Sequence, residues 1–451
     1  MTIDEAIEIV ETVLAKGRLS KVQEIIFRQS WEGLSYSEIA KNSGYDTGYV
    51  KDAGYSLWRS LSQAFGDKVN KNNFQLFLKR HAQTQTPNLH RKITRARQIN
   101  TKCDWGEAVD TSTFYGRNAE LTTLEQWIVS DRTRLVTLLG MGGIGKTTLS
   151  IKLAEQIEEQ FTYIIWRSLR NAPTIQDILT DLIKHLSNGQ AIDLPESVDG
   201  KISLLISYLR ASRCLVILDN AETILRSGDR AGNYCPGYEG YGQLLRCVAE
   251  TIHQSCLVLT SREKPRGLAS FEGLTLPVRS LYVAGLTAAA AQYIFQAKGL
   301  CISSAQGQVL IERYGGNPLA LKMIATNIQE LFDGNVCQFI YQGTALFGDV
   351  WQLLEQHFER LSDLEKHIMY VLATHKEWVS IPELLDDIAF VSLRELLEAL
   401  ESLKGRSLIE KTTPITPDKT SPCFMQQPAV MEYVSSKLLE QTQLALAALT
   451  C

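Results

Sequence analysis

The residues of this chain that are best suited to chemistry lie in one stretch, residues 140–148, with the sequence GMGGIGKTT. It fits the pattern G-x-x-x-x-G-K-T, in which glycines let the backbone fold so tightly that several N–H groups point at one phosphate. Lys146 is long enough to reach the β- and γ-phosphates of a nucleotide, and the hydroxyl of Thr147 can bind Mg²⁺. We therefore predict a site for a nucleoside triphosphate with Mg²⁺. The predicted nucleotide contacts in this stretch are Gly140, Gly142, Gly143, Ile144, Gly145, Lys146, Thr147 and Thr148.

Further candidate residues follow two later apolar runs. The first run ends in Asp219, which predicts a buried parallel strand with a carboxylate at its carboxyl edge, where it can hold Mg²⁺ opposite Thr147. Glu222 is close enough to orient or activate a water molecule, although it equally fits a surface carboxylate on the loop. The second run is followed by Arg262, a cation that can distinguish ATP from ADP by contacting the γ-phosphate. Lys146, Asp219, Glu222 and Arg262 are thus the predicted catalytic residues.

The elements that must position these residues alternate between strands and helices. Four apolar runs predict buried strands, at residues 134–139, 161–167, 214–219 and 256–262. The stretches between them are helical, which predicts a doubly wound parallel α/β sheet over residues 113–275 with its ligand at the carboxyl ends of the strands. Tyr115 and Arg117 lie just before this core and suit an adenine ring and a phosphate, but these residues alone are equally typical of a turn.

The N-terminal residues, 1–81, have a helical pattern throughout. A very short helix, a glycine-containing turn and a longer helix from about Thr47 predict a trihelical, helix-turn-helix-like module. The exposed positions of the longer helix include only two cations, Lys51 and Arg59, whereas helices that read DNA usually bring more Arg, Asn or Gln to the bases. We expect a protein partner for this module, and DNA binding through residues 1–103 is the alternative.

A basic segment, residues 82–112, follows the N-terminal module. No acidic residue lies between Asp67 and Asp104, so this part of the chain carries a local positive charge. Such a run can follow the phosphate backbone of DNA, but it is more often a solvated linker. We predict a linker between two domains here.

The C-terminal half is predicted to contain two further domains. Residues 276–345 contain helical stretches that predict a small bundle, and one of these begins at Pro318, which suits the first position of a helix. Residues 346–445 combine three helices with two short strands, the pattern of a winged helix. Its third helix has a largely acidic exposed face, which disfavours DNA binding, so we expect a regulatory lid. The overall expectation is therefore a multidomain chain of α and α/β modules.

Composition narrows the class of protein. The chain of 451 residues has a net charge of -4, which gives it no overall attraction to nucleic acid or to an anionic membrane. No apolar run approaches the length of a membrane span, and the N-terminus lacks the features of a signal peptide. The nine cysteines include no C-x-x-C pair, which favours the reducing cytoplasm. We expect a cytoplasmic protein without membrane contact.

The order of these motifs resembles that of the NB-ARC type of STAND signalling NTPases. The resemblance covers about residues 113–440. The motifs that carry it are Gly116-Arg117 after Phe114, the P-loop at 140–148, Leu218-Asp219, Thr260-Ser261-Arg262 and the sequence GGNPLAL at 315–321. It implies a switch that binds ADP at rest and forms a homo-oligomer when ATP replaces it. Residues 1–81 also resemble a helix-turn-helix domain found at the front of bacterial NTPases of this kind.

The same resemblance implies roles for particular residues. Arg117 would lie near the nucleotide, Pro318 would pack on the adenine and Arg262 would sense the γ-phosphate. The family often has a second Asp after the strand-end Asp, and Asn220 at this position implies slow ATP hydrolysis. The family's Met-His-Asp signature aligns with Gln426-Gln427-Pro428, so its usual histidine contact with the β-phosphate is missing, and Gln427 would offer a neutral hydrogen bond instead.

These observations support three hypotheses about function. The first is a nucleotide-switched signalling protein, with slow ATPase activity, that relays its state to an N-terminal interaction module. The second is an ATP-dependent transcription regulator that binds DNA through residues 1–103. The third is a P-loop kinase, and it has the least support because no acceptor site is evident in the sequence.

Overall fold

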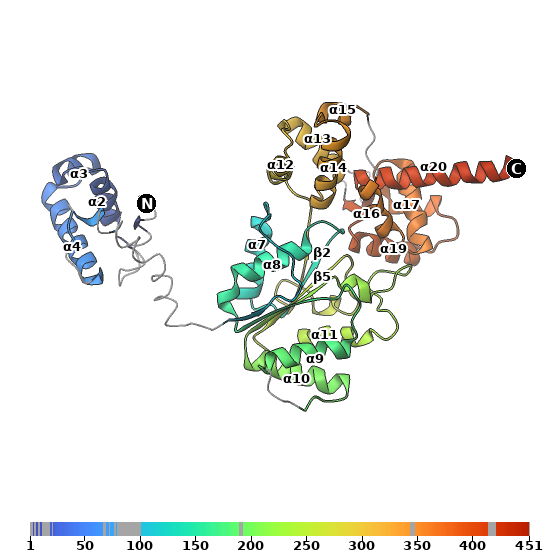
Figure 1. Cartoon of the computed structure of the whole chain (residues 1–451), viewed down its shortest axis with the longest axis horizontal. Coiled ribbons are helices and arrows are strands. Elements are labelled where there is room, and N and C mark those ends of the chain that lie inside the picture. Colours follow the sequence, from blue (N-terminus) through green and yellow to red (C-terminus); the bar gives the residue numbers. More distant parts are fainter. Residues whose placement is uncertain are drawn as a thin grey trace. The chain divides into compact units, whose positions relative to one another are not determined.

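The computed structural model describes residues 21–65, 101–188, 193–342, 348–413 and 421–450, with a few further positions between residues 3 and 78. The chain divides into two compact units, Met1–Gln98 and Ile99–Cys451. Each unit has hydrophobic clusters of its own, and Figure 1 shows the first unit in blue and the second in cyan to red. Among the described residues, no helix is both long and apolar enough to cross a bilayer.

The first unit contains a helix-turn-helix. Its continuously described helices are α2 (Lys21–Trp31), α3 (Tyr36–Ser43) and α4 (Thr47–Phe65). Ser35 begins α3 in a capping box, and Gly44, with φ of 74°, ends this helix by donating its N–H to Ala40 O. The short helix, turn and longer helix predicted from the sequence are confirmed. Most of the predicted first helix, over residues 3–14, falls outside the described residues.

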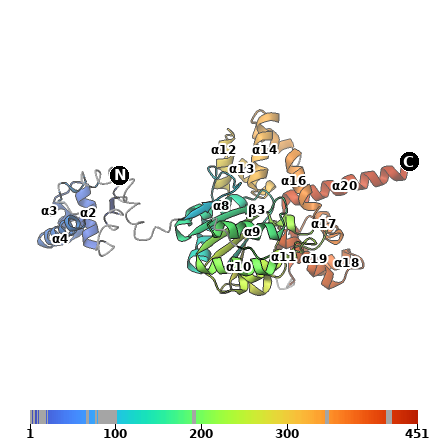
Figure 2. The same ribbon diagram turned by 60° about the horizontal axis from the view of Figure 1, so that its bottom comes forward.

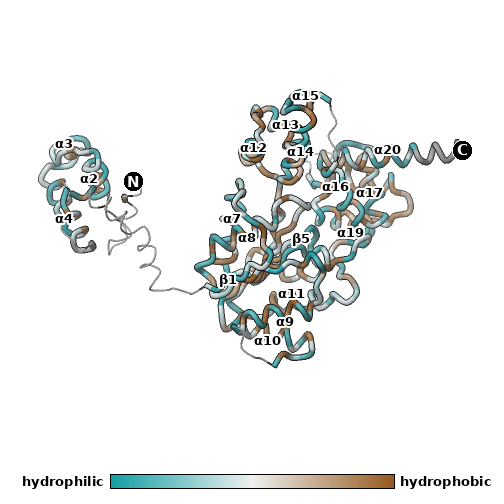
Figure 3. Tube along the Cα trace, viewed as in Figure 1, coloured by the Kyte–Doolittle hydropathy of each residue, from teal (hydrophilic) through white to brown (hydrophobic). Residues whose placement is uncertain are grey.

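A parallel sheet of six strands forms the centre of the second unit within the described residues. In sheet order its strands are β1 (Lys102–Asp104), β3 (Tyr163–Ser168), β4 (Cys214–Asp219), β5 (Cys256–Ser261), β2 (Leu135–Leu139) and β6 (Val278–Tyr282). The central strands β2, β4 and β5 are buried along their whole length, as their hydrophobic composition in Figure 3 suggests. The four strands predicted from apolar runs are confirmed.

Helices cover both faces of this sheet, as a parallel sheet requires. On one face lie α7 (Asn118–Glu125) and α8 (Lys146–Gln156). On the other face lie α9 (Ile175–Leu186), α10 (Val198–Ala211) and α11 (Glu239–Glu250), which come forward in Figure 2. The predicted doubly wound α/β architecture is therefore confirmed. The carboxyl ends of the strands point toward the helical bundle and the winged helix that follow in the chain (Figure 1).

The two edge strands differ from the prediction. β1 lies within the segment predicted as a linker, residues 82–112, and β6 lies beyond the predicted end of the domain at residue 275. β1 pairs in parallel with β3, so this part of the predicted linker belongs to the sheet, while the linker positions before residue 101 lie outside the described residues. Both strands are partly exposed, so neither has the long apolar run by which buried strands are recognised.

A helical bundle and a winged helix complete the second unit. The bundle contains α12 (Ala288–Ala297), α13 (Ser304–Tyr314), α14 (Pro318–Leu331) and α15 (Val336–Gln342). The winged helix contains α16 (Gly348–Phe358), α17 (Asp363–His375), α18 (Ile381–Asp387) and α19 (Leu393–Gly405), and α20 (Pro428–Thr450) extends from it (Figure 1). Its antiparallel sheet has the order β7 (Val379–Ser380), β9 (Cys423–Gln426) and β8 (Ile409–Thr412). The predicted bundle and winged helix are confirmed, whereas α16 was not predicted.

The separate hydrophobic clusters of the two units lead to a testable expectation. Leu57 on α4 is fully buried, whereas Tyr55 on the same helix is 69% exposed. We expect Leu57→Ala to lower the free energy of unfolding of the first unit by about 2–5 kcal/mol, because a packed side chain is removed. Scanning calorimetry of the whole chain measures both units, with Tyr55→Ala as the matched control. A shift of both unfolding transitions by Leu57→Ala would contradict independent folding of the two units.

Candidate functional site

The P-loop connects the end of β2 to the start of α8. Gly143 and Gly145 have φ values of 77° and 98°, a backbone conformation that favours glycine. A Cβ atom on Gly143 would approach the Cβ of Leu319 to 2.6 Å, so this position also has no room for a side chain. No side chain caps α8 at Gly145, so the first N–H groups of this helix are available to an anion.

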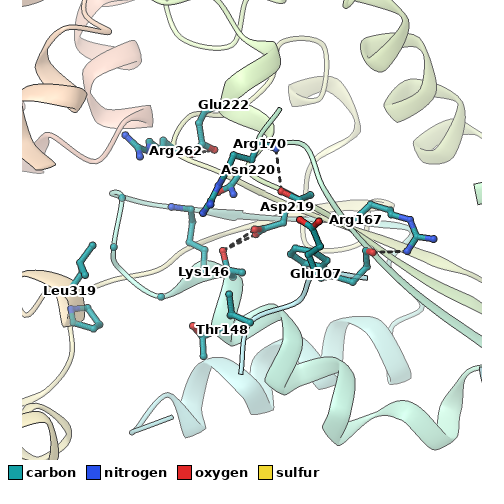
Figure 4. Close-up of a pocket in the computed structure, with 18 of the residues that line it drawn as sticks. Glu107, Lys146, Thr148, Arg167, Arg170, Asp219, Asn220, Glu222, Arg262 and Leu319 are labelled. Atoms are coloured by element: carbon teal, nitrogen blue, oxygen red, sulfur yellow. Dashed lines mark hydrogen bonds and ion pairs between the residues drawn. The ribbon is translucent and has the colours of Figure 1, made fainter. Parts of the chain in front are cut away.

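The P-loop borders a cavity of about 740 Å³, a volume that suits a nucleotide. Most of the predicted site residues line it, and Figure 4 shows several of them as sticks. These lining residues are Gly142, Gly143, Gly145, Lys146, Thr147, Thr148, Asp219, Glu222, Arg262 and Pro318. The cavity thus combines residues of the sheet, the P-loop and the start of α14.

Thr147 and Asp219 meet at the carboxyl edge of the sheet. The Thr147 hydroxyl donates to Asp219 Oδ1 at 2.8 Å, and the Thr260 hydroxyl donates to the same oxygen at 2.5 Å. Asp219 is almost completely buried, and burial raises the pKa of its carboxyl while these hydroxyl donors oppose that shift. Carboxylate and hydroxyl oxygens are hard ligands of the kind that Mg²⁺ prefers. In the described part of the chain no three His, Cys, Asp or Glu residues gather around a metal position, so a metal here would also need ligands from the nucleotide or water.

Lys146 lies inside the P-loop. Its Nζ donates to Gly140 O at 2.8 Å and to Met141 O at 3.0 Å. Burial lowers the pKa of the Lys146 ammonium group to about 8. The ammonium group therefore satisfies two carbonyls of the loop and lies beside the cavity in which a phosphate would attract it.

The predicted catalytic residues Glu222 and Arg262 form an ion pair. Arg262 Nε lies 3.1 Å from Glu222 Oε1, and the backbone N–H of Arg262 donates to Glu222 Oε2 at 3.2 Å. Glu222 is buried and lines the cavity, so it is not a surface carboxylate. Asn220 donates its backbone N–H to the Thr260 hydroxyl, and its amide side chain cannot act as a base.

Tyr115 and Arg117 do not line the cavity, in contrast to the contacts expected for them. The ring of Tyr115 stacks on Tyr293 with centroids 5.6 Å apart. Arg117 is buried and donates to Ala284 O at 2.6 Å and to Ile144 O at 3.0 Å. Its guanidinium therefore binds a backbone carbonyl of the P-loop. Ile144 and Gly140 likewise support the loop without lining the cavity. The contacts of Tyr115 and Arg117 with a nucleotide stay predictions.

The helical bundle contacts the P-loop through the start of α14. Asn317 Nδ2 donates to Gly142 O at 2.9 Å, and the N–H of Leu319 donates to Gly143 O at 3.3 Å. Asn317 also caps α14 by accepting the N–H groups of Leu319 and Ala320. The GGNPLAL motif therefore joins the bundle to the P-loop, and Pro318 lines the cavity, while its contact with an adenine stays a prediction.

The winged helix contacts the same loop through a histidine that the sequence analysis missed. His357 on α16 is buried, and its Nε2 accepts the N–H of Gly142 at 2.9 Å. Burial lowers the pKa of His357 well below its usual value, and the nearby cations Arg262 and Lys146 lower it further, so the ring is neutral and Nε2 is an acceptor. No local motif surrounds this histidine, so nothing in the sequence marks it.

Gln426 and Gln427 do not take the place of the missing histidine in the signature. Gln426 is fully buried, and its Nε2 donates to Met369 O at 2.6 Å. Gln427 lines a separate, much smaller cavity together with Met141 and Asn317. Gln427 is not among the residues that line the larger cavity, and its hydrogen bond to a phosphate stays a prediction.

A buried carboxylate fixes the winged helix to the end of β5. Glu263 directly follows Arg262 and is completely buried. It pairs with Arg360 and, at 3.1 Å, with Arg406, both of which belong to the winged-helix region. Arg360 also donates to Glu222 O at 2.9 Å. These charged groups compensate one another, which buried charges require.

The wall of the cavity near β3 includes residues from the segment after β1. Glu107 and Val109 line the cavity together with Trp166 and Arg167, and Figure 4 labels Glu107 and Arg167. Arg167 on β3 pairs at 2.5 Å with Asp104, the last residue of β1, which directly precedes this segment. Glu107 was not predicted as a site residue because it lies in the segment predicted as a linker.

Two family models match this chain. Residues 117–224 match the NB-ARC domain, and residues 1–81 match the N-terminal HTH of vWA-MoxR associated proteins. The described fold agrees with both matches. Residues 117–224 contain a P-loop at the carboxyl end of a strand in a parallel sheet, and the N-terminal region contains a helix-turn-helix.

Individual relatives extend these matches. An uncharacterized WD repeat-containing protein of Nostoc is 55% identical over 351 residues, which cover 75% of this chain and 27% of that protein. A probable disease resistance protein of Arabidopsis thaliana is 24% identical over 59% of this chain and 27% of its own length. A STAND protein with a tetratricopeptide repeat sensor from Pyrococcus horikoshii is 18% identical over 73% of this chain and 44% of that chain, with a TM-score of 0.38. The chain thus spans about a quarter of the length of these two curated relatives.

The double role of Asn317 leads to a second testable expectation. We expect Asn317→Ala to lower the free energy of unfolding of the second unit by about 1–2 kcal/mol, because the helix cap and the bond to Gly142 O are both lost. Asn317→Ser keeps an acceptor for the helix cap but is too short to reach Gly142, so it should lose only about 1 kcal/mol. Urea unfolding measures both values. Equal losses in the two variants would show that the cap contributes nothing.

Proposed function

Because this chain belongs to the NB-ARC-type STAND NTPases and carries an N-terminal helix-turn-helix domain, we propose that it is a nucleotide-switched signalling ATPase. ADP occupies the site at rest, and ATP defines the active state. The observation that carries this proposal is the convergence of three domains on one phosphate-binding loop. Lys146 of the NTPase domain, Asn317 of the bundle and His357 of the winged helix all bond to the loop backbone. A nucleotide bound at this loop would therefore lie next to contacts from all three domains.

The residues around the cavity define how the nucleotide is held. The N–H groups at the start of α8 and Lys146 bind the phosphates, and Pro318 offers an apolar surface to the adenine. Thr147 and Asp219 would hold Mg²⁺, which neutralises charge on the phosphate oxygens. These assignments agree with the polar and apolar walls of the cavity.

Hydrolysis of ATP at this site is slow in our proposal. Glu222 is the carboxylate best placed to activate water, but it forms an ion pair with Arg262. Asn220 stands where the family often has a second Asp, and an amide cannot accept a proton. Activation of water thus requires Arg262 to leave Glu222, which a γ-phosphate favours by attracting the guanidinium. Hydrolysis would then act mainly to return the protein to its resting state.

We propose a protein partner for the N-terminal module, residues 1–81. The exposed side of α4 and the turn before it include Tyr45, Tyr49 and Tyr55. Exposed aromatic residues are enriched at protein interfaces, whereas DNA-binding helices depend on cations for phosphate contacts. A homo-oligomer in the ATP state is part of the same proposal. The described cysteines form no disulfide, which is consistent with the cytoplasmic location that we propose.

The nucleotide site can be tested with one lysine variant. We expect Lys146→Ala to weaken binding of ADP and ATP by at least about tenfold, because a charge-assisted hydrogen bond to phosphate contributes about 1.5–3 kcal/mol. Titration calorimetry measures this affinity, and an unchanged unfolding temperature shows that the fold survives. Lys152→Ala is the matched control, because Lys152 lies on the exposed side of α8 and pairs with Glu155. A wild-type chain that binds neither nucleotide would overturn the proposed function.

The proposed relay from the nucleotide site to a protein partner is tested by comparing partner binding in the presence of ATP and of ADP. We expect the whole chain to capture a protein from a cell extract in ATP but not in ADP, and the Lys146→Ala variant to capture it in neither. The same material is tested against duplex DNA over a range of salt concentrations. Binding to one DNA site at least about tenfold more tightly than to random DNA would favour the transcription regulator instead.

A further inference from the structure

The ring of His357 lies directly against the P-loop. Its Nε2 accepts the N–H of Gly142 at 2.9 Å, and the side chain is 4% exposed. A Cβ atom built on Gly142 would lie 2.7 Å from Nε2 of His357 and 3.2 Å from Cζ of Arg262. The histidine and the arginine therefore fill the space beside this glycine together.

The contact with Arg262 indicates which part of the site this space belongs to. Gly142 lies beside Arg262, the residue that we expect to contact the terminal phosphate of ATP. The imidazole of His357 therefore occupies space next to the position that we expect for a third phosphate. The residues at the start of α8, Gly145, Lys146, Thr147 and Thr148, line the cavity and remain accessible to the other phosphates.

We propose that His357 makes the resting site specific for a nucleoside diphosphate, because its ring takes the Gly142 N–H and the adjoining space that the terminal phosphate of a nucleoside triphosphate requires. The inference rests on the proposed function, since it concerns the same site. Imidazole Nε2 and a phosphate oxygen are both acceptors, and one N–H cannot bond fully to both. ATP therefore binds only after α16 moves away from the loop.

Displacement of His357 would also loosen the winged helix. Arg360 lies three residues after His357, and it bonds to Glu222 O and pairs with Glu263. Glu222 and Glu263 are, respectively, the ion-pair partner and the chain neighbour of Arg262. An arginine drawn toward a third phosphate thus disturbs both contacts of Arg360 while the phosphate displaces His357. The two effects favour the same movement of α16.

The charged groups around His357 keep its ring neutral. A neutral ring that accepts through Nε2 cannot donate a hydrogen bond from that atom to a phosphate, so a phosphate would displace it. Lys146 and Arg262 face it from the NTPase domain, and Arg360 and Arg406 face it from the winged-helix region. These cations and complete burial keep the imidazole neutral. A neutral ring whose Nε2 lone pair points at the loop offers no positive charge to an anion.

The inference predicts a change in nucleotide preference. Titration calorimetry on the whole chain compares ADP with a non-hydrolysable ATP analogue, both with Mg²⁺. We expect wild type to prefer ADP, and His357→Ala to bind the analogue at least about tenfold more tightly while its affinity for ADP changes less than about twofold. His357→Gln places an amide oxygen near the same N–H, so it should retain most of the ADP preference.

His375→Ala is the matched control, because His375 belongs to the same domain but pairs with Asp387 away from the cavity. An unchanged ratio of the two affinities in His357→Ala, or an equal loss of both, would overturn the inference while the proposed function stands. Failure of wild type to bind either nucleotide would instead overturn the proposed function.

A second measurement needs no substitution and remains decisive where His357→Ala fails to fold. Hydrogen–deuterium exchange of the wild-type chain reports on the backbone of residues 348–360. We expect faster exchange in this segment with the ATP analogue than with ADP, because α16 leaves the loop only for the third phosphate. Equal exchange with the two nucleotides would contradict the displacement of α16.

Discussion

The backbone of the P-loop has polar groups that must find partners, and the arrangement of the second unit follows from how they do so. A loop built from glycines brings its N–H and C=O groups close together, and buried groups of this kind are costly when unpaired. Lys146 satisfies carbonyls within its own domain, while Asn317 and His357 satisfy the two sides of Gly142 from other domains. The backbone of the P-loop is therefore also the place where the three domains meet.

Charge compensation adds a second constraint at the same place. Glu263 is completely buried, and its partners Arg360 and Arg406 come from the winged-helix region. Such pairs contribute little net stability relative to apolar packing, but the loss of one partner is expensive. These ion pairs therefore favour one arrangement of the domains over others, although they add little to the free energy of unfolding. Because Glu263 adjoins Arg262, a change in the charge that Arg262 faces also reaches this network.

The sequence predicts the parts of the site that depend on local patterns. The P-loop, the strand that ends in Asp219 and the strand before Arg262 combine apolar runs with a motif at a fixed spacing, and the structure confirms all three elements. Strand β1 is too short and exposed to be recognised in this way. His357 and Glu263 act through contacts with residues distant in the chain, for which no local signal exists. Fold class is thus accessible from the sequence, whereas the contacts between domains are not.

The glutamines that replace the family's histidine signature suggest a weak resting state when they are judged from the sequence alone. The geometry leads to a different argument, because Gln426 bonds to Met369 O and an imidazole reaches the loop from α16 instead. A histidine that donates to the second phosphate would strengthen the binding of ADP. His357 instead accepts from the loop, so under our proposal it would leave ADP affinity nearly unchanged and act against the third phosphate. The resting state would then depend on exclusion of ATP and not on a tighter grip on ADP.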